Sequence, residues 1–89
     1  MTDYHTILAH FGIRNQEDKL IDECAELVHE VYKNRASRNL DGLASEIADV
    51  ENMLEQVKIY YKLHEQVKLI KFSKIERTLN LIQNGRDNK

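Results

Sequence analysis

Acidic residues in two segments of the chain stand at a spacing that suits metal binding. Glu23 and Glu26 are three residues apart in the run DECAELVHE, and Glu46 and Asp49 have the same spacing in the run SEIADV. Residues three apart share one face of a helix, where like charges repel each other by about 0.2–0.5 kcal/mol per pair. A divalent cation would remove that repulsion, and oxygen ligands without cysteine favour a hard ion, Mg²⁺ or Mn²⁺. The spacing therefore predicts a carboxylate site for a divalent metal.

A second interpretation of these acids needs no metal. The chain holds 15 Asp and Glu residues, so pairs at this spacing also arise as solvated helix edges, and the spacing alone does not separate the two interpretations. Of the neighbouring acids, Glu30 is interpreted as a flanking or solvated residue rather than a ligand, and Asp22, near the edge of the arc, as a residue beside the ligands or exposed to solvent. Cys24 lies among apolar positions and is expected to be a small core residue.

Four helices are expected to position these side chains, because apolar residues recur at helical spacing along most of the chain. Their expected ranges are about Tyr4 to Phe11, from after a cap at Asn15 to about Lys33, from a cap at Asn39 or Asp41 to about Tyr61, and from there to about Asn84. No Gly or Pro marks the turn expected near residues 61–65, so one long helix with a stagger remains an alternative there. Residues 1–84 are predicted to form a single all-α domain and residues 85–89 a flexible tail.

The second and third expected helices each carry an apolar seam. The seam residues step alternately by three and four: Leu20, Cys24, Leu27 and Val31 in one, and Leu43, Ile47, Val50, Leu54, Val57 and Tyr61 in the other. At about 100° of rotation per residue, Glu23 and Glu26 lie along one edge of the seam of the second helix. Glu46 and Asp49 lie along the corresponding edge of the seam of the third helix. A short loop makes the two helices antiparallel. When two antiparallel helices pack seam to seam, the corresponding edges of the two seams lie on the same side of the helix pair. We therefore expect the four carboxylates to converge, with the two pairs within about one helical turn of each other.

The composition is that of a small, ordered, helix-rich protein. The chain has 89 residues, of which 42% are hydrophobic and 31% charged. No run approaches the ~20 apolar residues of a membrane span, and the N-terminus lacks the basic start and long apolar run of a signal peptide. The lone cysteine excludes an internal disulfide and a zinc-type cysteine cluster. A cytoplasmic protein without a membrane partner is expected.

Charge is distributed unevenly along the chain. Residues 1–61 hold 12 acids against 6 Lys or Arg, a net of −6, and residues 62–89 hold 7 Lys or Arg against 3 acids, a net of +4. An acidic body argues against binding of a nucleic-acid polymer. It is compatible with a metal-bound polyanion held between the acidic body and the basic C-terminal element.

Two longer stretches, HFGIRNQEDKLIDECAEL and ASEIADVENMLEQVKIYY, resemble the MazG-like nucleotide pyrophosphohydrolases, in particular the short single-module members of bacteria and their phages. That family's pattern is ExxE, a spacer, then ExxD, and here nineteen residues separate Glu26 from Glu46. Supporting matches are the lead-in Gly12-Ile13-x-x-Gln16, the run Ala48-Asp49-Val50 and the string Lys71-x-x-Lys74-x-x-Arg77. The resemblance covers residues 10–61 well and residues 62–82 loosely. Asp22 is a departure, because many members carry Glu there.

The resemblance implies an all-α helical bundle of about four helices per chain, completed by assembly into homodimers or homotetramers. It implies that Glu23, Glu26, Glu46 and Asp49 bind Mg²⁺, with Mn²⁺ as a substitute, and form the catalytic centre. The implied reaction converts a nucleoside or deoxynucleoside triphosphate and water into the monophosphate and pyrophosphate. Nucleotide-pool house-cleaning is the role that such an activity suggests.

Substrate-binding residues are suggested less directly. Lys71, Lys74 and Arg77 are candidates for the phosphate tail, with a plainly solvated helix face as the alternative. Phe11, Asn52 and Tyr60 are candidates for a base pocket, and Tyr4 and Tyr61 could join them by stacking or hydrogen bonding; core or surface positions are the alternative for each.

Two other functions fit parts of the pattern. Glu26 and His29 have the i, i+3 spacing of the ligand pairs in di-metal carboxylate bundles, but the third expected helix offers no second His. A non-catalytic helical oligomer that serves as an interaction module would show the same apolar seams. Mutation of Glu46 or Asp49 separates the interaction module from a metal site, because only a metal site would lose stabilisation by divalent ions.

Overall fold

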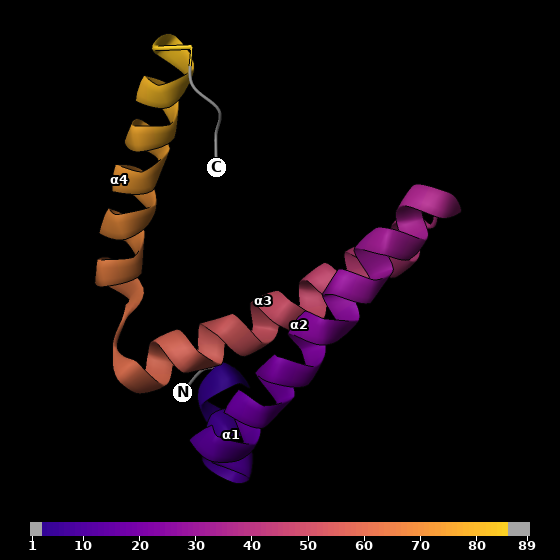
Figure 1. The fold of residues 1–89 in the computed structure, drawn as a ribbon. Coiled ribbons are helices and arrows are strands. Elements are labelled where there is room, and N and C mark those ends of the chain that lie inside the picture. The colour runs from indigo at the N-terminus through magenta and orange to yellow at the C-terminus, as the bar shows by residue number, and fades with distance from the viewer. Residues whose placement is uncertain (1–2, 86–89) are drawn as a thin grey trace.

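The computed structural model describes residues 3–85, and within them it contains four α-helices and no strand. The helices are α1 (Asp3–Phe11), α2 (Ile13–Ala36), α3 (Leu40–Tyr61) and α4 (His64–Gln83). α2 and α3 lie side by side and run in opposite directions, α1 packs near the start of α2 and the end of α3, and α4 projects away from the other three (Figure 1). The predictions of an all-α chain and of four helices are confirmed. Residues 86–89 of the predicted tail lie outside the described residues.

The corner between α1 and α2 depends on Gly12. Its φ of 85° lies in the left-handed region, which glycine adopts without the steric penalty of a side chain. α2 therefore begins at Ile13, earlier than predicted, and the prediction that Asn15 caps the helix is wrong. Asn15 lies inside the helix, where its Nδ2 donates a hydrogen bond to the backbone oxygen of Phe11 at 2.7 Å. This bond satisfies a carbonyl at the C-terminus of α1, which has no partner within its own helix.

The loop between α2 and α3 is closed by two asparagines. Asn39 Oδ1 accepts a hydrogen bond from the backbone N–H of Gly42 at 3.1 Å, which confirms Asn39 as the cap of α3. The backbone N–H of Asn39 donates to Asn34 Oδ1 at 2.9 Å and ties the loop back to the last turns of α2. The loop is short because α2 continues to Ala36, beyond the predicted end at Lys33.

The elbow between α3 and α4 is built without glycine or proline. Lys62 adopts φ 57° and ψ 50°, a left-handed conformation that costs a non-glycine residue roughly 1–2 kcal/mol. The backbone N–H of Leu63 donates to the Lys58 oxygen at 2.9 Å, as expected for a left-handed helix end. Next to the elbow, His64 Nε2 lies 2.6 Å from Glu55 Oε1. The two helices are therefore separate, as one of the two alternatives predicted.

The interface between α2 and α3 is more polar than the apolar seams predicted. Among the described residues, the buried apolar side chains are Val50 and Met53, and the buried polar ones are Gln16, Glu30 and Gln56. The predicted seam residues Leu20, Leu27, Leu43 and Val57 are half-buried, whereas Cys24, Val31, Ile47, Leu54 and Tyr61 are exposed. The prediction of Cys24 as a core residue is therefore wrong.

The reason is a rotation of both contacting faces toward the polar residues. Gln16 meets Gln56, and seven residues further along α2 Glu23 approaches Asp49, which is seven residues back along α3. Another seven residues along, Glu30 lies against Gly42. Polar residues thus occupy the heptad positions at which the helices meet, and part of each apolar seam turns outward.

α4 contributes no buried residue to the described fold. Its exposed large apolar side chains are Leu69, Ile70, Phe72, Ile75, Leu79 and Ile82. Among the described helices, none combines the length and the apolar character that crossing a membrane requires.

Candidate metal centre and adjoining pocket

Three carboxylates from two helices meet beside the α2–α3 interface. Glu23 of α2 and Glu46 and Asp49 of α3 each offer an oxygen atom that lies within 4.8 Å of the other two. The antiparallel register explains the meeting, because Glu23 faces Asp49 across the interface and Glu46 is one helical turn away on the same face. The structure thus brings together three of the four acids that the spacing singled out.

Glu46 experiences the strongest electrostatic conflict in this cluster. Partial burial raises the pKa of the Glu46 carboxyl, and the nearby charges of Glu23, Asp49, Glu26 and Glu30 raise it further, in that order. Its Oε2 atom is buried and has no hydrogen-bond partner among the described residues. Lys19 Nζ lies 3.3 Å from Glu23 Oε1, but its side chain is largely exposed and a surface pair of this kind neutralises little. A proton or a cation is needed to offset the repulsion.

Two other acids of α2, Glu26 and Glu30, differ from expectation in opposite ways. Glu26 is exposed and lies outside the group of three, although it is near enough to raise the pKa of Glu46. Glu30 was expected to be either a flanking or a solvated acid, and the solvated alternative is wrong, because the residue is only 8% exposed. It is buried because α3 approaches closely at Gly42, where an added Cβ would collide with Glu30 Oε1.

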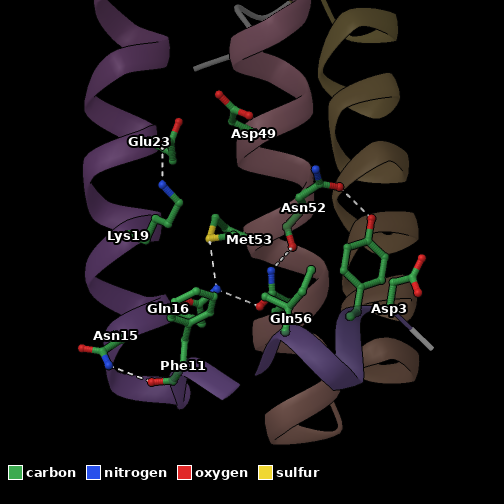
Figure 2. A pocket seen from close by; sticks show the side chains of 12 residues that line it. Asp3, Phe11, Asn15, Gln16, Lys19, Glu23, Asp49, Asn52, Met53 and Gln56 are labelled. Carbon is green, nitrogen blue, oxygen red and sulfur yellow. Dashed lines mark hydrogen bonds and ion pairs between the residues drawn. The ribbon is translucent and has the colours of Figure 1, made fainter. Parts of the chain in front are cut away.

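A pocket of about 800 Å³ opens next to the acids, between α1, α2 and α3. Figure 2 shows Glu23 and Asp49 at one end of it and Gln16 and Gln56 further down. The residues that line it are Asp3, Tyr4, Ile7, Phe11, Asn15, Gln16, Lys19, Glu23, Asp49, Asn52, Met53 and Gln56. An apolar pocket with a few placed polar groups is the usual form of a small-molecule site.

Amide side chains in this pocket are held in defined orientations. Gln56, which is 1% exposed, donates from Nε2 to the Asn52 backbone oxygen at 3.1 Å and accepts from Gln16 Nε2 at 2.9 Å. Tyr4 donates its hydroxyl hydrogen to Asn52 Oδ1 at 2.7 Å. The Asn52 amide nitrogen therefore remains a donor to the pocket.

The candidates for base binding separate in the structure. Phe11 and Asn52 line the pocket, and so does Tyr4, whereas Tyr60 is exposed and packs edge-on against Tyr61. The sequence analysis did not identify Gln16 and Gln56 as pocket residues. Gln16 stands four residues before Leu20 and so continues the spacing of the α2 seam, which was the available signal.

The basic residues of α4 lie elsewhere. Lys71, Lys74 and Arg77 are exposed on a helix that projects away from α2 and α3, so the structure does not bring them to the acids within one chain (Figure 1). His29 is exposed and lines a shallow depression with Asp22 and Glu26. The group of three acids contains no histidine.

The arrangement is chemically suited to a divalent cation and an organic ligand side by side. Three converging carboxylates, one of which has a buried unpartnered oxygen, form an oxygen-only donor set, which fits Mg²⁺ or Mn²⁺ rather than a softer metal. The pocket shares Glu23 and Asp49 with that donor set, so a ligand in the pocket would approach a bound cation. No family model, curated protein or solved structure matches the chain.

Proposed function

We propose that the protein is a Mg²⁺-dependent nucleoside triphosphate pyrophosphohydrolase of the MazG-like type. The reaction would convert a (deoxy)nucleoside triphosphate and water into the monophosphate and pyrophosphate. The observation that carries the proposal is the convergence of Glu23, Glu46 and Asp49 at the end of a pocket that contains an aromatic ring and oriented amides. Cytoplasmic nucleotide-pool house-cleaning is the corresponding role.

In this proposal the carboxylate cluster holds the metal. Glu23, Glu46 and Asp49 would be ligands, and Glu26, one turn from Glu23 on α2, would be the fourth acid of the ExxE/ExxD pattern. Bound Mg²⁺ would supply neutralisation of phosphate charge and a lower pKa for a bound water. A carboxylate oxygen not engaged by the metal would accept the proton of the attacking water.

The pocket would hold the base and sugar. Phe11 offers a ring for stacking. The Tyr4 hydroxyl donates to Asn52 Oδ1, so the amide nitrogen of the same Asn52 side chain can donate hydrogen bonds to a base carbonyl or ring nitrogen. Because the acids lie at one end of this pocket, a nucleotide would extend from the amides toward the metal with its phosphates at the acidic end.

Assembly into dimers or tetramers belongs to the same proposal. α4 exposes a row of apolar side chains, and α3 exposes Leu40, Ile47, Leu54 and Tyr61 at intervals of seven residues. A second copy would cover these surfaces as a helical bundle. Lys71, Lys74 and Arg77 could then serve the phosphates of a neighbouring chain, which the projection of α4 prevents within one chain.

One observation favours a second function. The exposed apolar rows of α3 and α4 would serve a non-catalytic interaction module as well as an enzyme. Such a module would assemble without needing the carboxylates, so Asp49→Asn would leave its assembly and its response to divalent ions unchanged. A di-metal bundle that uses Glu26 and His29 has less support, since no histidine joins the three converging acids.

The direct test is a panel of standard and modified triphosphates with Mg²⁺, scored for pyrophosphate and orthophosphate. Pyrophosphate and monophosphate in equal amounts, lost in Asp49→Asn and retained in Glu51→Gln, is the expected result. Glu51 is a matched control because it is an exposed acid of the same helix outside the cluster. Orthophosphate as the sole direct product would overturn the proposed cleavage site, and no hydrolysis of any triphosphate would overturn the function.

A further inference from the structure

A depression of about 120 Å³ lies at the elbow between α3 and α4. Its lining is mostly basic and consists of Lys58, His64, Val67, Lys68 and Lys71. Among the described residues, no acid lines it, although the chain as a whole carries more acids than bases. Lys58 belongs to α3 and the other four residues to α4, so positive charge from two helices meets on one concave surface at the elbow seen in Figure 1.

Glu55 orients two of these basic groups. Its Oε2 atom lies 3.1 Å from Lys58 Nζ, and its Oε1 atom lies 2.6 Å from His64 Nε2. The Lys58 side chain is only 31% exposed, so its methylene groups are partly packed and its ammonium group has little freedom to move away. One carboxylate of α3 therefore fixes a basic group on each side of the elbow.

The charge of Glu55 does not balance the lysines of the depression. Lys58, Lys68 and Lys71 carry three positive charges against one negative charge of Glu55, an excess of two. In the part of the chain that the structure describes, neither Lys68 nor Lys71 takes part in an ion pair, and the exposed Glu65 in the first turn of α4 pairs with neither. Positive charges gathered on a concave surface raise the local potential and attract anions.

The size of the depression restricts what it can hold. It is far smaller than the 800 Å³ pocket beside the carboxylates and lies below the roughly 300–1,000 Å³ of sites for drug-sized ligands. A single tetrahedral oxyanion suits this size better than a nucleoside does. A lysine ammonium donates up to three hydrogen bonds and binds phosphate as a point charge. A phosphate monoester carries a charge of about −1.5 to −2 at pH 7, which matches the excess of positive charge.

We propose that the depression at the elbow binds a phosphate group, which Lys58 contacts from α3 and Lys68 and Lys71 contact from α4. The ligand class is a phosphate group, either of a free phosphate ion or of a nucleotide. Because α4 buries no residue in the described fold, a ligand that bridges the elbow would restrict the direction in which α4 projects. The site is independent of the proposed hydrolysis, since it uses no residue of the carboxylate cluster or of the pocket beside it.

The test is a nuclear magnetic resonance titration of the full-length, isotope-labelled protein in EDTA with sodium phosphate, with sodium chloride keeping the ionic strength constant. The backbone amides of residues 58 and 64–71 are expected to shift and to saturate. Lys68→Gln should weaken phosphate binding about 10-fold or more, because a charged hydrogen bond is lost. Lys68→Arg keeps the charge and should retain most of the affinity. Lys68 is chosen because Lys71 is also a candidate for the substrate phosphates.

Lys33→Gln is the matched control, because it removes the same charge from an exposed side chain at the opposite end of the α2–α3 pair. It should bind phosphate like the wild type, and circular dichroism shows whether each variant is folded. Hydrogen exchange gives a second readout: phosphate should slow exchange of the Leu63 amide, which donates to the Lys58 oxygen at the elbow, in the wild type but not in Lys68→Gln.

The source of the phosphate group is distinguished by a nucleoside monophosphate, with the affinity followed at the same elbow amides. A nucleotide site would bind the monophosphate at least 10-fold more tightly than orthophosphate, and a site for free phosphate ions would bind the two about equally; each result supports the site. Equal phosphate affinity in Lys68→Gln and the wild type, or no saturable shift at the elbow, would overturn it.

The outcomes also separate this site from the proposed function. Asp49→Asn should lose triphosphate hydrolysis and keep the phosphate affinity of the elbow. Phosphate binding at the elbow without hydrolysis of any triphosphate would support this site and overturn the proposed function. Hydrolysis without phosphate binding at the elbow would do the reverse.

Discussion

Along α2 and α3, polar side chains occupy the positions where two helices meet, whereas along α4 large apolar side chains are exposed in the part of the chain that the structure describes. Gln16, Glu30 and Gln56 are buried in the first region, and Phe72 and Ile82 are exposed in the second. The first arrangement weakens a folded chain by burying polar groups, and the second does so by leaving apolar groups in water.

The contrast shows where the usual pattern of helix packing breaks down. Local rules of helix packing fail at sites where the residues have another task, and here they fail at the carboxylates and the pocket beside them. The apolar surface left on α3 and α4 is then available for association with another chain. Substitutions at the polar residues of α2 and α3, and at the exposed apolar residues of α4, test the two regions separately.

The largest effect is expected from removing one charge of the carboxylate cluster. Asp49→Asn keeps the side-chain size, and we expect it to lower Mg²⁺-dependent triphosphate hydrolysis about 10³-fold, which corresponds to about 4 kcal/mol of transition-state stabilisation. It should also abolish the rise in melting temperature that Mn²⁺ causes, because that rise reports binding to the folded state. Steady-state kinetics and differential scanning fluorimetry measure both effects. An Asp49→Asn protein with full activity would contradict the metal assignment.

The next largest effect is expected from placing a charge on the apolar row of α4. Phe72→Glu should weaken self-association about 30-fold or more, since a central interface aromatic contributes about 2 kcal/mol or more. Sedimentation equilibrium measures the dissociation constant. Ser73→Glu is the matched control, because it adds the same charge to an exposed neighbour on another face of the helix. A wild-type chain that is monomeric at all concentrations would contradict the proposed assembly.

A smaller effect is expected from the buried amide pair. Gln56→Leu removes the acceptor of Gln16 Nε2 and should lower the free energy of unfolding by about 1–3 kcal/mol, because a buried donor loses its partner. The double variant with Gln16→Leu and Gln56→Leu should recover most of that loss, since both polar groups are then gone. Urea denaturation of the four proteins completes the double-mutant cycle. If the double variant is no more stable than Gln56→Leu alone, the unpaired Gln16 amide is not the cause of the lower stability of Gln56→Leu.

The smallest effects are expected from two glutamates whose pKa values shift in opposite directions. The pKa of Glu46 is raised in the folded protein by burial and by neighbouring acids, so the unfolded chain releases this proton first as the pH rises. The metal-free protein should therefore lose stability between about pH 4.5 and the raised pKa, and retain that loss at neutral pH. Glu46→Gln should raise the melting temperature in EDTA at pH 7, and saturating Mg²⁺ should reduce the pH dependence of the wild type.

Glu55, at the elbow between α3 and α4, has a pKa that shifts in the opposite direction to that of Glu46. Hydrogen bonds from His64 and Lys58 lower the pKa of the Glu55 carboxyl. Its contribution to stability is then complete above about pH 4.5 and is lost as the pH falls through the lowered pKa. Glu55→Gln should lower the melting temperature at pH 7, the reverse of Glu46→Gln. Melting curves from pH 3 to 8 in EDTA compare the two, and the same direction of change in both variants would contradict the assignment.

The sequence predicted the elements better than it predicted their facing surfaces. Four helices, the cap at Asn39 and the antiparallel α2–α3 pair follow from periodicity and local hydrogen bonding, which are short-range effects. The buried faces did not follow, because the polar residues at positions 16, 23 and 30 recur with the same period as the apolar seam. Periodicity shows which residues share a face but not which of two adjacent faces will pack.

Two further differences between the predicted and the observed helices have local causes that the residue types do not reveal. Asn15 is a favourable cap, but Gly12 already makes the corner, and α2 begins before Asn15 is reached. Lys62 takes the left-handed conformation that glycine usually provides, so nothing in its chemistry marks the elbow. The spacing pointed to the three acids that converge and also to Glu26, which does not join them, whereas the burial of Glu30 depends on the absence of a side chain at Gly42, which lies across the interface.

The repeat of facing pairs every seven residues also makes loop length a determinant of the site. Only residues 37–39 separate α2 from α3, so the number of residues in that connector decides which side chains stand opposite each other. Adding or deleting one residue in so short a connector would shift the pairing of the two helices and carry Asp49 away from Glu23. The connector should therefore tolerate substitutions at residues 37 and 38 better than substitution of the cap Asn39 or any change in length.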